Sequence, residues 1–289
     1  MKTIKPIFWL VSASLAFSQQ VVANDWFMPT PLSRMYSALV IDKTQLAWQE
    51  MLLALSQESI DEKHWENAKQ TLISQSQCGK LLLGDLSFNQ QRYIRLTIQK
   101  KTNSMQQGFK LKVSLGGVEK SAAISLRDQQ GQAWISGSTT EPKQGYVELE
   151  SDDFVYAPTP GFYQLTIDNT IYPIILSFNY DQSWIEVNNS NADSPISIQV
   201  PKTLASCQAA NMRWQWFDDK FTMLGNSQLI QLSTSNLGTE GYKNARLPEY
   251  FPNHAKWLSA VVSKSEYQGE VRIEYAQRFT FPIKIKTNE

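Results

Sequence analysis

Apolar and polar residues alternate along most of the chain, and this alternation limits the possible folds more than any other feature of the sequence. Ile94, Leu96 and Ile98 alternate with polar residues, and similar patterns return in residues 109–115 and 212–216. A period of two places successive side chains on opposite faces of a β-strand. Because turn sequences separate these short segments roughly every 8–12 residues, we predict antiparallel β-sandwiches.

The predicted strands fall into two sets, which meet near residues 180–183. We expect an Ig-like β-sandwich over residues 80–180 and a second β-sandwich over residues 181–289. The segment Gly-Phe-Tyr-Gln-Leu-Thr-Ile at 161–167 resembles the penultimate strand of many bacterial Ig-like modules, which favours this fold. Pro282 has no backbone N–H to donate, so we expect the last strand to lie at a sheet edge.

The segment before the predicted strands, residues 24–79, has the period of an amphipathic helix. Its apolar residues recur at three- and four-residue intervals, which is typical of helices that bury one face. Asp42 with Gln45, and Ser59 with Glu62, have the spacing of capping boxes at helix starts. We therefore predict a bundle of three short helices, and an α+β fold class that is mainly β.

The chain has two cysteines, Cys78 and Cys207. An even number of cysteines in an exported protein favours a disulfide, whereas two buried thiols are the alternative in a reducing compartment. We expect a Cys78–Cys207 bridge that ties the helical segment to the distant second strand set. In the chain-entropy account, closing so long a loop is worth up to about 4–5 kcal/mol.

The N-terminus has the three parts of a secretory signal peptide. Lys2 and Lys5 precede an apolar run at 6–17, and Val-Val-Ala at 21–23 supplies the small residues of a cleavage site. The run is too short for a stop-transfer helix, and a buried core helix is the alternative. We expect cleavage after residue 23 and a soluble periplasmic or secreted product that does not insert into the membrane.

The charge balance gives no sign of a polyanionic partner. The chain has 27 basic and 27 acidic residues, and removal of residues 1–23 takes away two lysines and no acidic residue. Nucleic-acid binding and polybasic attachment to lipid both require an excess of basic residues. We therefore expect no nucleic-acid partner.

Few residues of the sequence suit catalysis or metal binding. The only histidines are His64 and His254, and the motifs of zinc proteases, serine hydrolases and phosphate loops are missing from the sequence. The carboxylates of the segment 148–153 lack the spacing of a calcium loop, so we expect a solvated strand edge there. We predict a protein that is not an enzyme and that has no cofactor and no metal.

Two groups of residues are candidate contacts for a partner. Residues 235–254 form a long segment without clear periodicity, and it carries Tyr242, Tyr250 and His254; long loops are often functional. In the second group, Trp214 and Trp216 lie on one face of a predicted strand and Phe217 on the other face. These rings either belong to the core or stack on a glycan. We expect one of Trp216 and Phe217 to be less buried than the other and to mark a contact surface.

Outline features of the sequence resemble an uncharacterised family of periplasmic proteins from vibrios and their relatives. The resemblance rests on the signal peptide, the Asp-Trp-Phe start at 25–27, Pro-Thr-Pro-Leu at 29–32, the helical first part, the two cysteines and the β-rich remainder. One member is encoded with a sensor kinase and a response regulator that answer cell-wall damage. The resemblance implies an accessory role in the cell envelope and assigns no site residues.

Two functions of different classes follow from these observations. One is a non-enzymatic protein that binds an envelope protein, for example a sensor ectodomain. The other is a glycan- or peptidoglycan-binding module that uses exposed aromatic rings. Two exposed, coplanar tryptophans would favour the glycan, and buried tryptophans would favour the protein partner.

The first prediction concerns export. The mature protein is expected to begin at Asn24 and to fractionate with the periplasm or the medium, because the sequence before Asn24 has the order of a signal peptide. Intact-mass analysis of protein purified from cells checks this. An intact Met1, or recovery in membranes alone, would contradict it.

Overall fold

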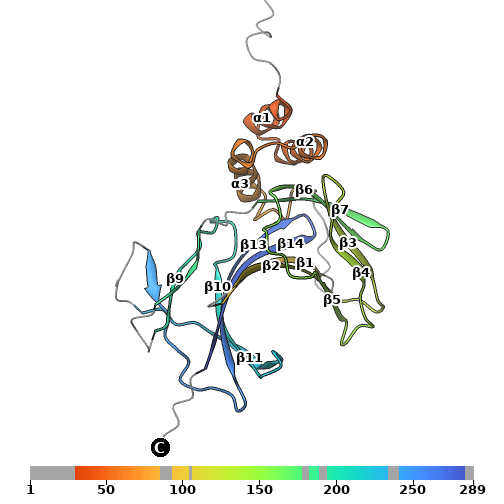
Figure 1. Cartoon of the computed structure of the whole chain (residues 1–289). Coiled ribbons are helices and arrows are strands. Elements are labelled where there is room, and N and C mark those ends of the chain that lie inside the picture. The colour runs from red at the N-terminus through yellow and green to blue at the C-terminus, as the bar shows by residue number, and fades with distance from the viewer. Residues whose placement is uncertain are drawn as a thin grey trace, which may run out of the picture. The chain divides into compact units, whose positions relative to one another are not determined.

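The computed structural model describes residues 30–84, 93–103, 106–177, 182–188, 194–233 and 241–283. The predicted signal peptide and its cleavage site lie outside these residues. Three α-helices and one short 3₁₀ helix are followed by fourteen strands in the described part of the chain, and Figure 1 shows the helices gathered at one end of the strands. The predicted mainly β, α+β fold is confirmed. In the described ranges, no helix has the length and apolar character needed to cross a membrane.

The helical segment consists of α1 (Ser33–Val40), α2 (Thr44–Gln57), a short 3₁₀ turn at Glu62–His64 and α3 (Glu66–Gln75). Its buried side chains form a core of their own around Trp48, Trp65 and Leu72, and Ile175 of strand β7 belongs to the same core. About 50 residues bury too little surface to be stable alone. The packing against β7 therefore supplies part of the stability of the helical segment.

The predicted capping boxes are wrong in detail. The N-cap of α2 is Lys43, which makes no side-chain capping bond, and Asp42 has a positive φ of 54°. At the 3₁₀ turn, the cap is Asp61 rather than Ser59, because the Asp61 carboxylate accepts a hydrogen bond from the backbone N–H of Lys63. A carboxylate one or two residues from the expected cap position serves the same purpose.

The largest sheet has seven strands in the order β11-β10-β13-β14-β1-β2-β5. Their bounds are β1 Tyr93–Thr102, β2 Gln107–Gly116, β5 Tyr146–Glu150, β10 Asn211–Phe217, β11 Met223–Leu229, β13 Trp257–Gln268 and β14 Val271–Pro282. Strands β1 and β14 pair in parallel over nine residue pairs, from Ile94 opposite Val271 to Thr102 opposite Phe279. The other neighbours in this sheet are antiparallel.

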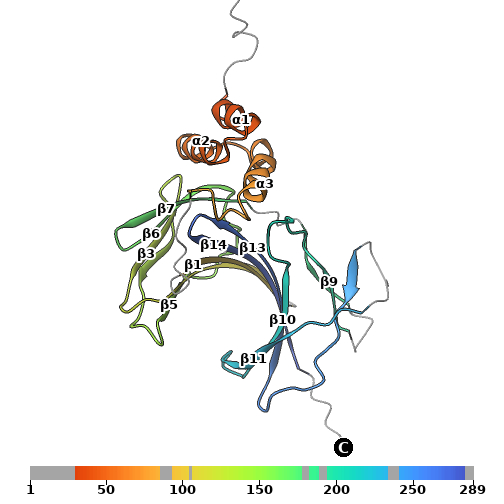
Figure 2. The same ribbon diagram turned by 180° about the vertical axis from the view of Figure 1, so that it is seen from behind.

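Two smaller sheets pack on one face of the large sheet. One has the order β4-β3-β6-β7, with bounds β3 Ala123–Asp128, β4 Ala133–Ser138, β6 Gly161–Ile167 and β7 Thr170–Leu176. The other has the order β12-β9-β8, with bounds β8 Ile185–Val187, β9 Ile196–Gln199 and β12 Tyr242–Asn244. The first contacts β2 and β5, and the second contacts β14. Figure 2 shows them at opposite ends of the large sheet.

The strands of the two predicted sandwiches share this large sheet. Strands β1, β2 and β5 come from residues 80–180, whereas β10, β11, β13 and β14 come from residues 181–289. One hydrophobic core runs from Leu96 to Phe279 and includes side chains of all three sheets. The boundary at residue 180 remains a prediction about folding units, but it is not a boundary between sheets.

The prediction that Pro282 marks an edge strand is wrong. Strand β14 lies between β13 and β1, well inside the sheet. Pro282 is the last residue of β14 and pairs only with Trp257 of β13, beyond the last β1 pair at Phe279. Its missing N–H therefore affects the end of the strand, where no second neighbour requires it.

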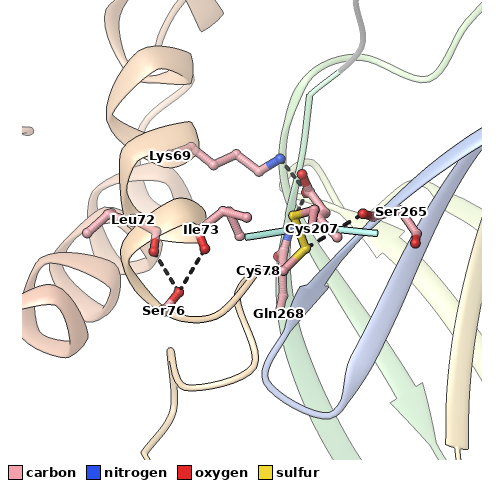
Figure 3. Close-up of a disulfide and its surroundings, with 9 residues drawn as sticks. Lys69, Leu72, Ile73, Ser76, Cys78, Cys207, Ser265 and Gln268 are labelled. Carbon is pink, nitrogen blue, oxygen red and sulfur yellow. Dashed lines mark hydrogen bonds and ion pairs between the residues drawn. A yellow bond between two sulfur atoms is a disulfide. The ribbon is translucent and has the colours of Figure 1, made fainter. Parts of the chain in front are cut away.

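The predicted bridge between Cys78 and Cys207 is present, and it spans 129 residues of sequence (Figure 3). The chain beside it pairs with the β13–β14 hairpin: the Tyr267 N–H donates to the Cys78 carbonyl at 2.8 Å, and the Gly269 N–H donates to the Gly79 carbonyl at 3.1 Å. A Cβ atom on Gly79 would lie 1.7 Å from the Tyr267 carbonyl oxygen. Only glycine allows this close approach.

The second prediction tests that approach. Gly79→Ala is expected to lower the free energy of unfolding by about 3 kcal/mol or more, because a backbone clash is added to an unfavourable positive φ. Gly131→Ala is the matched control, since Gly131 has a φ of 82° but no atom within 4 Å of the added Cβ. The control should lose only about 1–2 kcal/mol. Equal losses in urea unfolding would show that the contact with Tyr267 does not matter.

Candidate functional site

The large sheet has one apolar face and one polar face. The apolar face belongs to the core and includes Leu96, Val113, Trp214, Val262 and Ile273. The register places the alternate residues together on the opposite face, which we call the polar face. Its charged and hydroxyl residues, from β10 to β5, include Arg213, Ser259, Ser263, Ser265, Arg272, Glu274, Arg278, Thr280, Arg95, Thr97, Lys101, Lys110, Lys112, Ser114, Glu148 and Glu150.

The two smaller sheets pack on the core side, so the polar face remains accessible. The side chains of Arg95, Arg213 and Lys112 are 34%, 31% and 34% exposed. Small residues lie between them, and Ser259, Ser263 and Ala276 are buried. Long basic side chains therefore form much of the accessible part of this face.

Three arginines surround a single carboxylate in the middle of the polar face. Glu274 is buried, and its Oε1 accepts a hydrogen bond from the Ser263 hydroxyl at 2.9 Å. The Arg95 Nε lies 3.9 Å from one Glu274 oxygen, and an Arg213 Nη lies 3.8 Å from the other. Both distances exceed those of a hydrogen bond. Arg272 is directly opposite Arg95 on the neighbouring strand.

These arginines have donors without acceptors. The Nε atoms of Arg95, Arg213 and Arg272 are buried and have no hydrogen-bond partner among the described residues. A buried donor without an acceptor costs free energy, and like charges directly opposite each other across two strands are unfavourable. The buried Nε atoms are closed to a ligand, but the side chains of Arg95 and Arg213 are partly exposed. The accessible parts of these guanidinium groups are expected to attract an anionic group.

An aromatic group closes one end of the polar face. The Arg278 guanidinium lies 4.4 Å from the centre of the Phe217 ring, and its Nε donates to the Ser259 hydroxyl at 3.1 Å. Burial lowers the pKa of this guanidinium from its usual value. Beside it, Phe221 stacks on Trp257 with ring centres 5.2 Å apart, and 56% of Phe221 is exposed. This exposed ring is a candidate apolar anchor for a partner.

The other end of the polar face is neutralised internally. Lys110 donates to Glu150 at 2.9 Å, Lys101 donates to Asp153 at 2.8 Å, and Lys112 lies 3.3 Å from Glu148. Burial alone would raise the pKa of Glu150, but the hydrogen bond from Lys110 and the nearby lysines lower it overall. The predicted acid-lined strand edge is therefore paired with lysines of β1 and β2. No described group of His, Cys, Asp and Glu could hold a metal.

The aromatic strand predicted as a candidate contact lies in the core. Trp214, Trp216 and Phe217 are all buried. The prediction that one of Trp216 and Phe217 is less buried and marks a contact surface is wrong, because Trp216 is 5% and Phe217 is 7% exposed. Phe217 lies on the polar face, but Arg278 covers its ring. The Trp214 indole N–H donates to the Arg246 carbonyl at 3.1 Å. Trp214 and Trp216 are therefore not available for stacking on a glycan.

The three candidates from the predicted loop lie in different settings. Tyr242 belongs to β12, and its hydroxyl donates to the Ser183 carbonyl at 2.5 Å. Burial and the nearby Glu186 raise the pKa of Tyr242 to about 12. Tyr250 is 70% exposed, and His254 is exposed in a turn with a φ of 69°. Residues 234–240 of this loop lie outside the described residues.

A cavity of about 550 Å³ lies beside the disulfide. Its lining includes Cys207, Trp184, Lys264 and Glu266. Figure 3 shows Lys69 extending from α3 toward the neighbourhood of the disulfide. The buried Lys69 ammonium contacts Glu266 at 2.5 Å and Ser177 at 2.9 Å, and the Glu266 contact joins α3 to β13. Burial lowers the pKa of Lys264. These charges hold the helical segment on the sheet.

The family described as "Protein of unknown function (DUF2861)" matches residues 26–284 of the chain. No curated protein matches the chain.

Among solved structures, one similar chain is a tetra-tandem repeat from the extending region of a large adhesion protein. Its sequence identity is 11% and its TM-score is 0.20, and the match covers 67% of this chain and 50% of that chain. A Salmonella alpha-2-macroglobulin mutant has 12% identity and a TM-score of 0.19, with 63% and 14% covered. Titin domains I67–I69 have 9% identity and a TM-score of 0.17, with 65% and 64% covered.

The third prediction separates the two tyrosines. Tyr242→Phe is expected to lower the free energy of unfolding by about 1 kcal/mol, because it removes the hydrogen bond to the Ser183 carbonyl. Tyr250→Phe is the matched control on an exposed ring and should change it by less than about 0.5 kcal/mol. Urea unfolding measures both. If the free energy of unfolding of Tyr242→Phe equals that of the wild type, this hydroxyl contributes nothing to stability.

Proposed function

The chain belongs to the DUF2861 family of proteins of unknown function, and we propose its function from the properties of its surface. We propose that it is a non-catalytic protein of the bacterial envelope that binds a protein partner. The polar face of the large sheet is the proposed binding surface. The partner is an envelope protein, for example a sensor ectodomain, and the location is the periplasm.

The arginine group of the polar face is the observation that carries this proposal. Three arginines (Arg95, Arg213 and Arg272) surround one carboxylate, Glu274, on a face that neither smaller sheet covers, and Arg278 lies further along β14. Arginine is enriched in protein interfaces and among their strongest contributors. Phe221, at the end of the same face, adds an exposed aromatic ring. Basic donors beside an apolar anchor suit a polypeptide surface.

The disulfide supports the proposed location. Structural disulfides persist in oxidising compartments such as the periplasm, and Cys78 and Cys207 are bridged. The resemblance to periplasmic proteins linked to cell-wall damage agrees with this location. It motivates the search for the partner among sensor and envelope proteins.

Glycan binding is the second candidate, and one observation favours it. The Phe221 ring, stacked on Trp257, offers one exposed aromatic surface. Of the seven described tryptophans, six are buried and Trp257 is partly exposed. The described residues therefore have no pair of exposed, coplanar tryptophans, and the protein partner remains the stronger proposal.

The fourth prediction tests the binding surface in cells. A photo-crosslinking amino acid placed at Gln215, on the polar face, is expected to form one defined adduct with an envelope protein. The same amino acid at Leu53, exposed on α2, is the control and should form no such adduct. Mass spectrometry identifies the partner.

Three outcomes would contradict the proposal. An adduct at Leu53 but none at Gln215 would place the binding surface elsewhere. Sedimentation of the purified protein with peptidoglycan, lost in Phe221→Ala, would support the glycan candidate instead. Turnover of peptidoglycan by the purified protein, abolished by a carboxylate substitution, would show an enzyme.

A further inference from the structure

We propose that the polar face recognises an acidic, extended polypeptide segment, whose carboxylates bind Arg95, Arg213 and Arg272. This inference rests on the proposed function, because it names the chemistry of the partner at the same surface. Its ligand is defined by charge and by shape, and it requires no catalytic group.

The charges of the two halves of the polar face favour an acidic ligand. In the half nearest β5, Lys101, Lys110 and Lys112 pair with carboxylates of the chain itself. In the other half, Glu274 is the carboxylate near Arg95 and Arg213, and Arg272 lies directly opposite Arg95. This half therefore has a local excess of positive charge in a chain whose net charge is close to zero. An acidic segment is the complementary partner.

The donors of these arginines are already in place. Arg95 and Arg213 lie too far from Glu274 for hydrogen bonds. Arg272 makes no side-chain hydrogen bond or ion pair with any residue that the structure describes, although its Nε is buried. A guanidinium offers two parallel N–H donors to a carboxylate. Carboxylates of a ligand would also relieve the repulsion between Arg95 and Arg272, which are directly opposite each other.

The spacing of the arginines suits an extended segment along β14. Arg272 and Arg278 lie on the same strand, six residues apart, which corresponds to about 20 Å. Alternate residues of an extended peptide are roughly 7 Å apart on one side. Acidic residues six positions apart in such a segment would therefore match Arg272 and Arg278, while the residues between them pass over the buried Glu274 and Ala276. Phe221, beyond Arg278, would contact an apolar residue at the end of the segment.

An acidic polypeptide fits better than an anionic glycan. A sugar chain that binds by stacking needs several exposed ring surfaces along its length. Phe221 is exposed at one end of the polar face, and Tyr93 and Tyr146 are exposed on the same face. The Arg95 guanidinium lies 5.3 Å from the centre of the Tyr93 ring, and the Tyr146 hydroxyl bonds to Glu148 and Ser114, so these two rings already have partners within the chain. A polypeptide with carboxylates along its length needs a row of guanidinium groups and one apolar anchor, and the polar face has both.

The fifth prediction uses a defined peptide. A fluorescein-labelled peptide of four Glu-Thr repeats followed by an amidated Phe is expected to bind the full mature protein in fluorescence anisotropy. Binding should weaken several-fold as the salt concentration rises from about 50 to 300 mM, because salt screens exposed charges. The matching peptide with Lys in place of Glu should not bind.

Substitutions of Arg272 locate the site. Arg272→Gln is expected to weaken binding of the acidic peptide at least fivefold. The affinity of Arg272→Lys should fall between those of the wild type and Arg272→Gln, because lysine keeps the charge and loses the paired donors. Arg127→Gln is the matched control, an exposed arginine on β3 of a smaller sheet, and should leave binding unchanged. Thermal unfolding confirms that each variant is folded.

Several results would overturn the inference. One is that the Lys and Glu peptides bind the protein equally well. Another is that Arg272→Gln binds the acidic peptide as tightly as the wild type does. A third is that the protein binds an anionic polysaccharide such as heparin more tightly than the acidic peptide. If the adduct at Gln215 forms but the acidic peptide does not bind, the binding surface stands and the acidic segment is wrong. If neither is observed, both proposals fail.

Discussion

The parallel pairing of β1 with β14 is the interaction on which the rest of the structure depends. It joins a strand from the first half of the chain to the last strand over nine residue pairs. The two strand sets therefore form one seven-stranded sheet with one core instead of two separate ones. The same pairing places Arg95 opposite Arg272 and makes the polar face continuous. Without it, the arginines of the two halves would have no fixed relation to one another.

The end of this sheet is held by contacts with the helical segment. Lys69 is 1% exposed and pairs with Glu266 of β13. A buried ion pair contributes little net stability, because removing both charges from water is costly, but loss of one partner is strongly destabilising. The disulfide and the backbone bonds of Cys78 and Gly79 to the β13–β14 hairpin act at the same place. Together they fix the end of β14 that carries Arg272.

The alternation of apolar and polar residues predicted most strands, the helical segment was clear from its period, and the Cys78–Cys207 bridge is confirmed. Register was the missing information. Pro282 suggested an edge strand, because the amino-acid sequence does not show that β14 extends beyond its last pair with β1. The residue pattern does not indicate that Arg95, Arg213 and Arg272 form a group, since residues far apart in sequence meet only through the strand order. Trp214 and Trp216 were candidate contacts because they are large aromatic residues, but large aromatic residues are mainly found in the core.

A polar outer face alone is no sign of function, because every sandwich has solvated outer faces. The large sheet contains its own comparison. Near β5 the lysines have carboxylate partners within the chain, as a merely solvated face would. Around Glu274 the arginines outnumber the carboxylate, and their buried Nε atoms have no acceptors among the described residues. Two halves of one sheet, under the same solvent, thus differ in how their charges are satisfied. A ligand that brings carboxylates to the accessible parts of these guanidinium groups would balance the excess of positive charge around Glu274.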